Sequence, residues 1–132
     1  MHINVPTAFE GTVYRSAAGA GTDITFRHRG GYVVFDLDGP LALGWVADEL
    51  SHEVRAMLEG GRKDLIIDLT DVTYADSAGI GALVVARTLI EMAGGKLVLL
   101  SAQRRVREML KRMRLEPYFT FSDDPDFGLR KS

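Results

Sequence analysis

The segment from Asp64 to Gly95 constrains the fold more than any other part of this chain. It opens with an apolar, β-branched run at 65–67, which is typical of a strand buried on both faces of a sheet. A polar loop follows, and from Ser77 onward the residues are so apolar that we expect a largely buried helix. The glycine pair at 94–95 ends this helix, since glycine is favoured just past a helix C-terminus. Asp76 and Ser77 therefore lie between a strand and a helix, where open α/β sheets usually meet ligands and partners.

The rest of the chain supplies the other elements of an α/β domain. Alternating apolar and polar residues around a Gly-Gly turn predict a hairpin of strands at 24–29 and 32–37. Apolar residues at helical spacing predict a helix over 43–58, whose polar face comprises Asp48, Glu49, His52, Glu53 and Arg55. Further along we expect a strand at 97–100, a helix over 101–114 capped by Ser101, a short strand at 118–121 and a final turn or short helix.

This order of elements predicts a mixed β-sheet packed against α-helices. The strand at 65–69, the helix at 77–93 and the strand at 97–100 form a right-handed parallel βαβ unit. Residues 1–22 show little periodicity and favour a weakly ordered tail, so we place the domain at 23–132. With 132 residues in all, the chain is long enough to bury a core, and one domain is expected.

Composition excludes several classes of protein. The chain has no cysteine, which rules out disulfides, thiolate metal sites and cysteine nucleophiles. Its longest apolar run, at 80–86, falls far short of the roughly 20 residues that span a membrane. Because no signal peptide opens the chain either, we expect a cytoplasmic protein. Whether it is a monomer or a weak dimer stays open.

Charge is unevenly distributed along the chain. Residues 1–95 carry a net charge of −6, and residues 96–132 carry a net charge of +4. The strongly basic helix over 101–114 fits either a solvated outer face or contact with an acidic protein, an anionic lipid or a nucleic acid. We expect no direct nucleic-acid binding, because no aromatic residues interleave with the basic ones and the chain is acidic overall.

Ser77 has two interpretations. It could cap the helix, since serine and aspartate oxygens accept hydrogen bonds from the free N–H groups of a first turn. It could instead carry a phosphate, which the helix dipole and the same N–H groups would stabilise. Asp71 and Asp76 are close to it in sequence, so a phosphate of about −1.5 to −2 charges would change the local field sharply.

Gly79 and Gly81 occupy the first turns of the same predicted helix. Each costs roughly 0.5–1 kcal/mol relative to alanine at such a position. This cost indicates that something approaches the backbone closely there, either a neighbouring element or a partner protein.

Enzyme chemistry finds little support in the sequence. Residues 75–79 form a relaxed version of the G-x-S-x-G nucleophile elbow, but in that hydrolase order the histidine base follows the serine. The three histidines, His2, His28 and His52, all precede Ser77. The carboxylates lack the spacing of a calcium loop, and no phosphate-binding glycine loop is present. We therefore expect no catalytic residues, no metal and no cofactor.

The motifs as a set resemble the STAS domain, most closely the single-domain anti-anti-sigma factors (anti-sigma factor antagonists) of bacteria. The resembling span runs from about Ile24 to Phe127. Residues 37–41, Leu-Asp-Gly-Pro-Leu, resemble the family's turn before its first helix. Residues 76–81, Asp-Ser-Ala-Gly-Ile-Gly, are similar to its D-S-[ST]-G-[LI]-G signature, with Ala78 in place of the family's second hydroxyl residue.

This resemblance implies a STAS-type fold and a partner switch. The unphosphorylated protein would bind an anti-sigma factor that is also a serine kinase, and so free a sigma factor. Phosphorylation of Ser77 would end that binding, and a PP2C-type phosphatase would reset it. The surface that meets the partner would comprise Asp38, Asp76, Ser77, Gly79 and Gly81. The alternative is a structural or sensory subunit of a signalling or transport complex, without phosphorylation and with Ser77 only as a helix cap.

Overall fold

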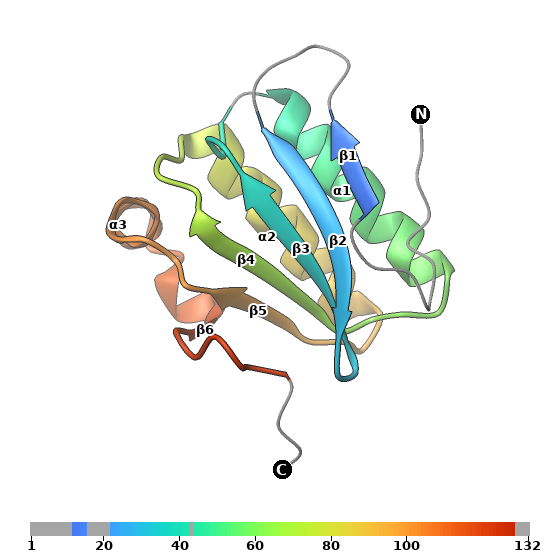
Figure 1. Ribbon diagram of the computed structural model, residues 1–132. Helices are drawn as coiled ribbons and strands as arrows, with labels where there is room; N and C mark the ends of the chain where they lie inside the picture. The colour runs from blue at the N-terminus through green and yellow to red at the C-terminus, as the bar shows by residue number, and fades with distance from the viewer. Residues whose placement is uncertain (1–11, 16–21, 43, 129–132) are drawn as a thin grey trace.

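The apolar run at 65–67 forms β4 (Leu65–Asp71), a central strand of a mixed sheet. The computed structural model describes residues 12–15, 22–42 and 44–128 (Figure 1). Their six strands neighbour one another in chain order. The strands are β1 (Thr12–Arg15), β2 (Asp23–Arg29), β3 (Tyr32–Asp38), β4, β5 (Leu97–Leu100) and β6 (Thr120–Ser122).

The type of strand pairing changes once across the sheet, at β3. β1, β2 and β3 pair antiparallel, whereas β3, β4, β5 and β6 pair in parallel. The predicted hairpin is confirmed, with Phe26 opposite Phe35 and their rings edge to face at 4.9 Å. The predicted parallel βαβ unit is also confirmed, because β4 and β5 pair in parallel on either side of a helix in the chain.

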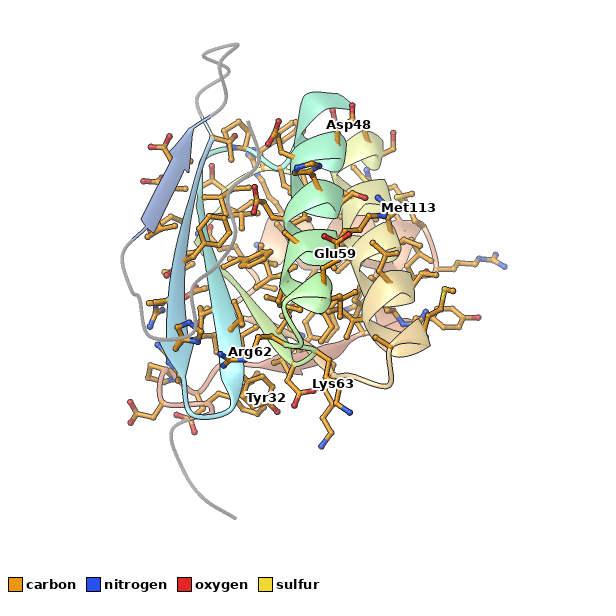
Figure 2. The ribbon with its side chains drawn as sticks, turned by 90° about the vertical axis from the view of Figure 1, so that its right-hand side faces the viewer. Tyr32, Asp48, Glu59, Arg62, Lys63 and Met113 are labelled. Atoms are coloured by element: carbon orange, nitrogen blue, oxygen red, sulfur yellow. The ribbon has the colours of Figure 1, made fainter. Side chains whose placement is uncertain are left out.

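Two long helices cover one face of the sheet. α1 (Gly44–Glu59) and α2 (Ser77–Met92) lie side by side along it (Figures 1 and 2). Both begin at the end of the molecule where β3 and β4 finish; Asp48 lies at this end and Tyr32 at the opposite one (Figure 2). The shorter α3 (Arg104–Arg112) and a 3-10 turn, η1 (Glu116–Tyr118), connect β5 to β6.

The main core fills the space between the sheet and these helices, and it includes one charged residue that the sequence analysis misplaced. Leu50, Val54 and Met57 of α1 are buried there, as predicted. Glu53 is fully buried too, so its assignment to the exposed face was wrong. The reason is its spacing: position 53 follows Leu50 by three residues and precedes Met57 by four, which places it within the buried stripe.

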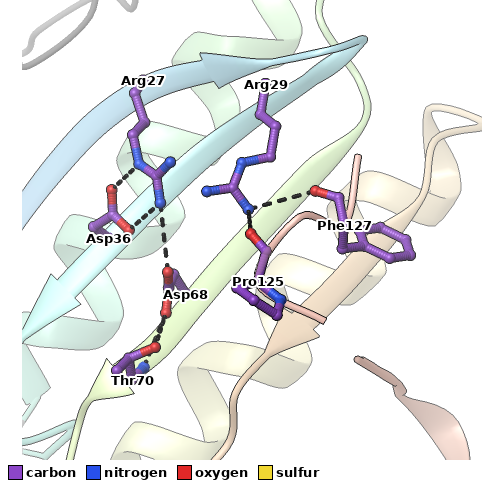
Figure 3. Close-up of polar contacts among 7 residues, drawn as sticks. All are labelled: Arg27, Arg29, Asp36, Asp68, Thr70, Pro125 and Phe127. Carbon is purple, nitrogen blue, oxygen red and sulfur yellow. Dashed lines mark hydrogen bonds and ion pairs between the residues drawn. The ribbon is translucent and has the colours of Figure 1, made fainter. Parts of the chain in front are cut away.

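The opposite face of the sheet is covered by the C-terminal segment. A small second cluster, formed by Val34, Ile66, Val98 and Leu100, is buried under Tyr32 and Phe127. The rings of Tyr32 and Phe127 lie 5.5 Å apart. Arg29 holds the segment in place by donating to the carbonyl oxygens of Pro125 at 2.9 Å and Phe127 at 3.4 Å (Figure 3).

A charged group lies beside that cluster on the same face. Arg27 donates two hydrogen bonds to the carboxylate of Asp36, at 2.5 and 2.9 Å, and reaches Asp68 at 3.4 Å (Figure 3). Asp68 also accepts from the backbone and hydroxyl of Thr70. These bonds join β2, β3 and β4 side to side, which explains why three charged residues are tolerated on a sheet face next to apolar neighbours.

The glycine pair at 94–95 ends α2 as predicted. Gly94 has a φ of 79°, which favours glycine. Its N–H donates to the carbonyl of Glu91, and the N–H of Gly95 donates to that of Ile90. These two bonds form the Schellman arrangement that satisfies the last carbonyls of a helix.

The segment after β5 differs from its prediction. α3 begins at Arg104, and Ser101 does not cap it: the N-cap is Gln103. Ser101 instead has a φ of 54°, and its N–H bonds to the carbonyl of Ser122, so the chain is still paired with β6 at that point. The last strand is at 120–122 instead of 118–121, because residues 116–118 form η1. A turn over residues 125–128 confirms the first option of the expected turn or short helix.

The N-terminal segment contains a strand that the sequence analysis did not expect. β1 lies within the proposed tail of residues 1–22 and pairs with β2, with Thr12 opposite Phe26. Residues 1–11 and 16–21 lie outside the described part of the chain. A domain boundary at residue 23 therefore stays a prediction.

Gly79 is explained by a neighbouring element. It is buried, and a Cβ at this position would lie 1.7 Å from the carbonyl oxygen of Leu41. Gly81 is different, because a Cβ there would meet nothing within 4 Å. Close approach of the Leu41 loop to α2 therefore requires glycine at position 79 but not at position 81.

These two glycines give a matched pair of variants. Gly79→Ala should lower the free energy of unfolding by about 1–3 kcal/mol, because the new methyl group overlaps the Leu41 carbonyl. Gly81→Ala should leave it unchanged or raise it by up to about 1 kcal/mol through helix propensity. Urea denaturation followed by circular dichroism measures both. Equal destabilisation by the two changes would contradict this account of Gly79.

Candidate functional site

Two loops meet at the end of the sheet where β3 and β4 finish. The loop after β3 reaches the loop of residues 72–76, and Leu41 forms an isolated parallel bridge with Ala75. The N–H of Leu41 donates to the carbonyl of Tyr74 at 2.9 Å, and the N–H of Asp76 donates to the carbonyl of Leu41 at 3.2 Å. The start of α2 is therefore held by backbone hydrogen bonds on its N-terminal side.

Asp76 is the N-cap of α2. Its backbone is extended, with φ −105° and ψ −179°, and its Oδ1 accepts a hydrogen bond from the N–H of Gly79 at 2.8 Å. Its carbonyl accepts the next N–H, that of Ile80, at 3.0 Å. The interpretation of Ser77 as the helix cap is therefore wrong, since the neighbouring aspartate has that role.

Ser77 is the first residue of the helix, and it is exposed. Within the part of the chain that the structure describes, its hydroxyl makes no hydrogen bond, and the N–H groups of Ser77 and Ala78 have no acceptor. An exposed hydroxyl at a helix N-terminus with two free N–H donors beside it is accessible to an enzyme. It is also well placed to carry an anion.

The surroundings of Ser77 are acidic. Asp38 and Asp71 are exposed at the ends of β3 and β4, where they are register partners on adjacent strands. Asp76 is half-buried directly before the serine. The structure thus brings Asp38, Asp76 and Ser77 to one end of the sheet, and their role in binding a partner stays a prediction. Gly79 lies there too but is buried, and Gly81 follows half a turn later, half-buried.

The approach of α3 to this site was not predicted from the sequence. A groove of about 210 Å³ separates α3 from the loop of residues 72–76, and Tyr74 and Ala75 form one of its walls. Arg105, Met109 and Arg112 contribute to the other wall. Their spacing of four and three residues places them on one face of a helix, a signal that is present in the sequence. Which loop that face meets depends on the order of strands in the sheet, which local patterns do not determine.

Among the described residues, no three carboxylate, histidine or cysteine side chains are grouped so that they could hold a metal ion. None of the helices in the described ranges combines the length and the hydropathy that a membrane span requires.

Known proteins share this fold. The chain resembles an anti-sigma factor antagonist from Mycobacterium paratuberculosis with 19% identity and a TM-score of 0.67, over 82% of this chain and 91% of that one. A candidate anti-sigma factor antagonist from Thermotoga maritima matches with 20% identity and a TM-score of 0.68, over 77% and 87% of the two chains.

A third similar protein is the anti-sigma factor antagonist SpoIIAA, which has been solved in two states. Its unphosphorylated form matches with 17% identity and a TM-score of 0.61, over 78% of this chain and 90% of that one. Its phosphorylated form, from Bacillus, matches with 17% identity and a TM-score of 0.60, over 76% and 92%.

The family model of the STAS domain matches residues 23–127. The match takes in every strand from β2 to β6, all the helices and the Asp-Ser-Ala-Gly-Ile-Gly start of α2 at the site. The chain therefore belongs to the STAS domain family.

Proposed function

We propose that this protein is an anti-sigma factor antagonist that works by partner switching. Its unphosphorylated form binds an anti-sigma factor that is also a serine kinase, and so frees a sigma factor. Phosphorylation of Ser77 ends the binding, and a PP2C-type phosphatase restores it. The single observation that carries the proposal is the exposed hydroxyl of Ser77 at the first position of α2, with Asp76 as the cap.

Two findings support this role. The chain belongs to the STAS domain family, and the solved proteins that it resembles include anti-sigma factor antagonists. One of these, SpoIIAA, has been solved in both an unphosphorylated and a phosphorylated form. The proposal makes the protein a cytoplasmic binding protein without catalytic residues, cofactor, metal or direct contact with nucleic acid.

Electrostatics supply the mechanism of release. A phosphate adds about −1.5 to −2 charges at neutral pH. On Ser77 it would join Asp76 and the Asp38–Asp71 pair, which already make this end of the sheet acidic. Acidic groups on the partner surface would then be repelled by the phosphate. Apolar groups on that surface would remove water from the phosphate, which is unfavourable, so either kind of surface would bind the hydroxyl form better. Asp38, Asp76, Ser77 and Gly81 form the proposed partner surface, and Gly79 supports it from below.

A second candidate function keeps the fold but not the switch. Ala78 replaces the second hydroxyl residue of the family signature, and α3 is strongly basic. Both observations favour a structural or sensory subunit of a signalling or transport complex. The two functions differ in whether Ser77 is ever phosphorylated.

Phosphorylation can be measured directly. Protein isolated from its own cells, or incubated with ATP and the serine kinases of the anti-sigma factor class from the same organism, should gain one phosphate. Intact mass and peptide mapping should locate it on Ser77, and Ser77→Ala should abolish the gain. No phosphate under any of these conditions would contradict the switch and favour the structural subunit.

Binding should respond to the charge at position 77. Ser77→Ala should bind the kinase without being released by ATP, whereas Ser77→Asp should bind it at least about tenfold more weakly, since about 1.4 kcal/mol of repulsion suffices for that. Isothermal titration calorimetry with the purified kinase measures both variants. Ser77→Asn serves as the polar, uncharged control, and equally tight binding by the Asp and Asn variants would contradict the electrostatic mechanism.

Stability separates the capping role from the switching role. Asp76→Ala should lower the free energy of unfolding by about 1 kcal/mol, because it removes the bond to Gly79. Ser77→Ala should change the free energy of unfolding by less than about 0.5 kcal/mol, because Ser77 is exposed and its hydroxyl makes no hydrogen bond with the described residues. Asp76→Asn should retain most of the stability, since asparagine caps as well as aspartate. Urea denaturation of the three variants measures these changes. A larger loss of unfolding free energy from Ser77→Ala than from Asp76→Ala would support Ser77 as the cap.

A further inference from the structure

The groove beside the candidate site has a mixed lining. It measures about 210 Å³ and lies between the loop that precedes α2 and one face of α3. Its lining residues are Tyr74, Ala75, Arg105, Glu108, Met109 and Arg112. The loop residues of this lining lie two and three positions before Ser77, so a molecule bound in the groove would be close to the proposed phosphorylation site.

One part of this lining is apolar and accessible to a partner. Tyr74 is 48% exposed, and Met109 is half-buried beside it. The other large apolar side chains that are exposed among the described residues are Val85, Met92, Met113 and Tyr118. Val85 and Met92 belong to α2, Met113 is the C-cap residue of α3, and Tyr118 belongs to η1, and none of these four lines the groove. Tyr74 and Met109 therefore form the apolar part of the groove, on which an apolar side chain of a partner can pack.

The other part of the groove lining is positively charged. Arg105 and Arg112 are both exposed, and neither forms an ion pair with any residue in the described ranges. The acid between them, Glu108, is bound to Arg104 at 2.9 Å, and this hydrogen bond lowers the pKa of the Glu108 carboxyl. The charge of Arg112 contributes more weakly to this lowering of the pKa. Neither Arg105 nor Arg112, however, has a carboxylate within ion-pair distance among the described residues, so two exposed cations flank the apolar wall.

We propose that this groove binds a segment of a partner protein in which a carboxylate lies next to an apolar side chain. The carboxylate would bind Arg105 or Arg112, and the apolar side chain would pack on Tyr74 and Met109. The idea that this segment belongs to the partner that meets Ser77 rests on the proposed function. The preference of the groove for a carboxylate beside an apolar side chain does not depend on that function.

The surroundings favour a protein carboxylate over a nucleic acid. Asp71 and Asp76 lie at either end of the loop that forms one wall, and Asp38 lies beside Asp71. A polyanion that follows the two arginines would be brought close to these three carboxylates, which would repel it. A short acidic segment places its charge only at the arginines and leaves the acidic end of the sheet uncovered.

A defined peptide tests the groove without knowledge of the partner. The probe is a short acetylated peptide that alternates glutamate with leucine and phenylalanine, titrated into the ¹⁵N-labelled full chain and followed by amide chemical shifts. We expect shifts at Tyr74, Ala75 and the Arg105–Arg112 face of α3, and weaker or no shifts with a peptide in which lysine replaces each glutamate. Because the protein is unphosphorylated throughout, the result does not depend on whether Ser77 is a phosphoacceptor.

The double variant Arg105→Glu/Arg112→Glu should weaken peptide binding by about tenfold or more, because it replaces the attraction of two arginines for the glutamates by repulsion. The matched control is Lys111→Glu/Arg114→Glu, which makes the same charge change at two exposed positions that do not line the groove and leaves the Arg104–Glu108 ion pair in place. Its effect should stay within about threefold. The amide spectra of both double variants report whether the fold is intact.

Several outcomes would overturn the proposal. Equal binding of the glutamate and lysine peptides, equal losses in the two double variants, or absence of shifts in the groove would show that the groove does not select a carboxylate. Shifts of the groove residues when the protein alone is concentrated would identify a second copy of this chain as the occupant. If the groove binds the peptide but Ser77 is never phosphorylated, the groove stands and the proposed switch fails.

Discussion

The docking of Leu41 onto the start of α2 is the contact on which the site depends. The carbonyl of Leu41 accepts the N–H of Asp76 and occupies the space that a side chain at position 79 would need. One carbonyl therefore contacts both the cap of α2 and the third residue of its first turn. This fixes the path of the loop at 72–76 and the direction of the helix together, and with them the position of the exposed hydroxyl of Ser77.

In this setting, capping and the proposed modification fall to different residues. A cap must hold a fixed hydrogen bond, which Asp76 does by accepting the N–H of Gly79. A phosphoacceptor must instead be free to enter the active site of another enzyme, and Ser77 is exposed at the next position. A phosphate on Ser77 could accept from the N–H groups of Ser77 and Ala78, which have no acceptor among the described residues, without displacing the cap. The helix terminus can therefore accept a second anion with little change to the fold.

Local patterns were sufficient to predict β2 to β5, α1, α2 and the position of Ser77, because hydrophobic period and glycine placement determine these features residue by residue. Local patterns failed where pairing with a segment distant in the chain determines the local structure. Pairing with β2 makes a strand of residues 12–15, and pairing with Ser122 draws Ser101 away from the cap of α3. The choice between Asp76 and Ser77 as cap depends on backbone angles that both residue types can adopt. The reason for Gly79 depends on Leu41, 38 positions earlier in the chain.

Under the proposed function, the charges around the loop at 72–76 indicate how one phosphate would control a partner without refolding the protein. The carboxylates of Asp38 and Asp71 lie on one side of this loop, and the arginines of α3 lie on the other. Ala75, which lines the groove, is two residues from Ser77, so their Cα atoms are separated by at most about 7 Å. This is close to the screening length of about 8 Å at physiological ionic strength. A phosphate on Ser77 would therefore add to the charge of the nearby carboxylates and repel an acidic segment that lies against Ala75. That repulsion needs no change in the bonds of Leu41 and Asp76 that hold the helix.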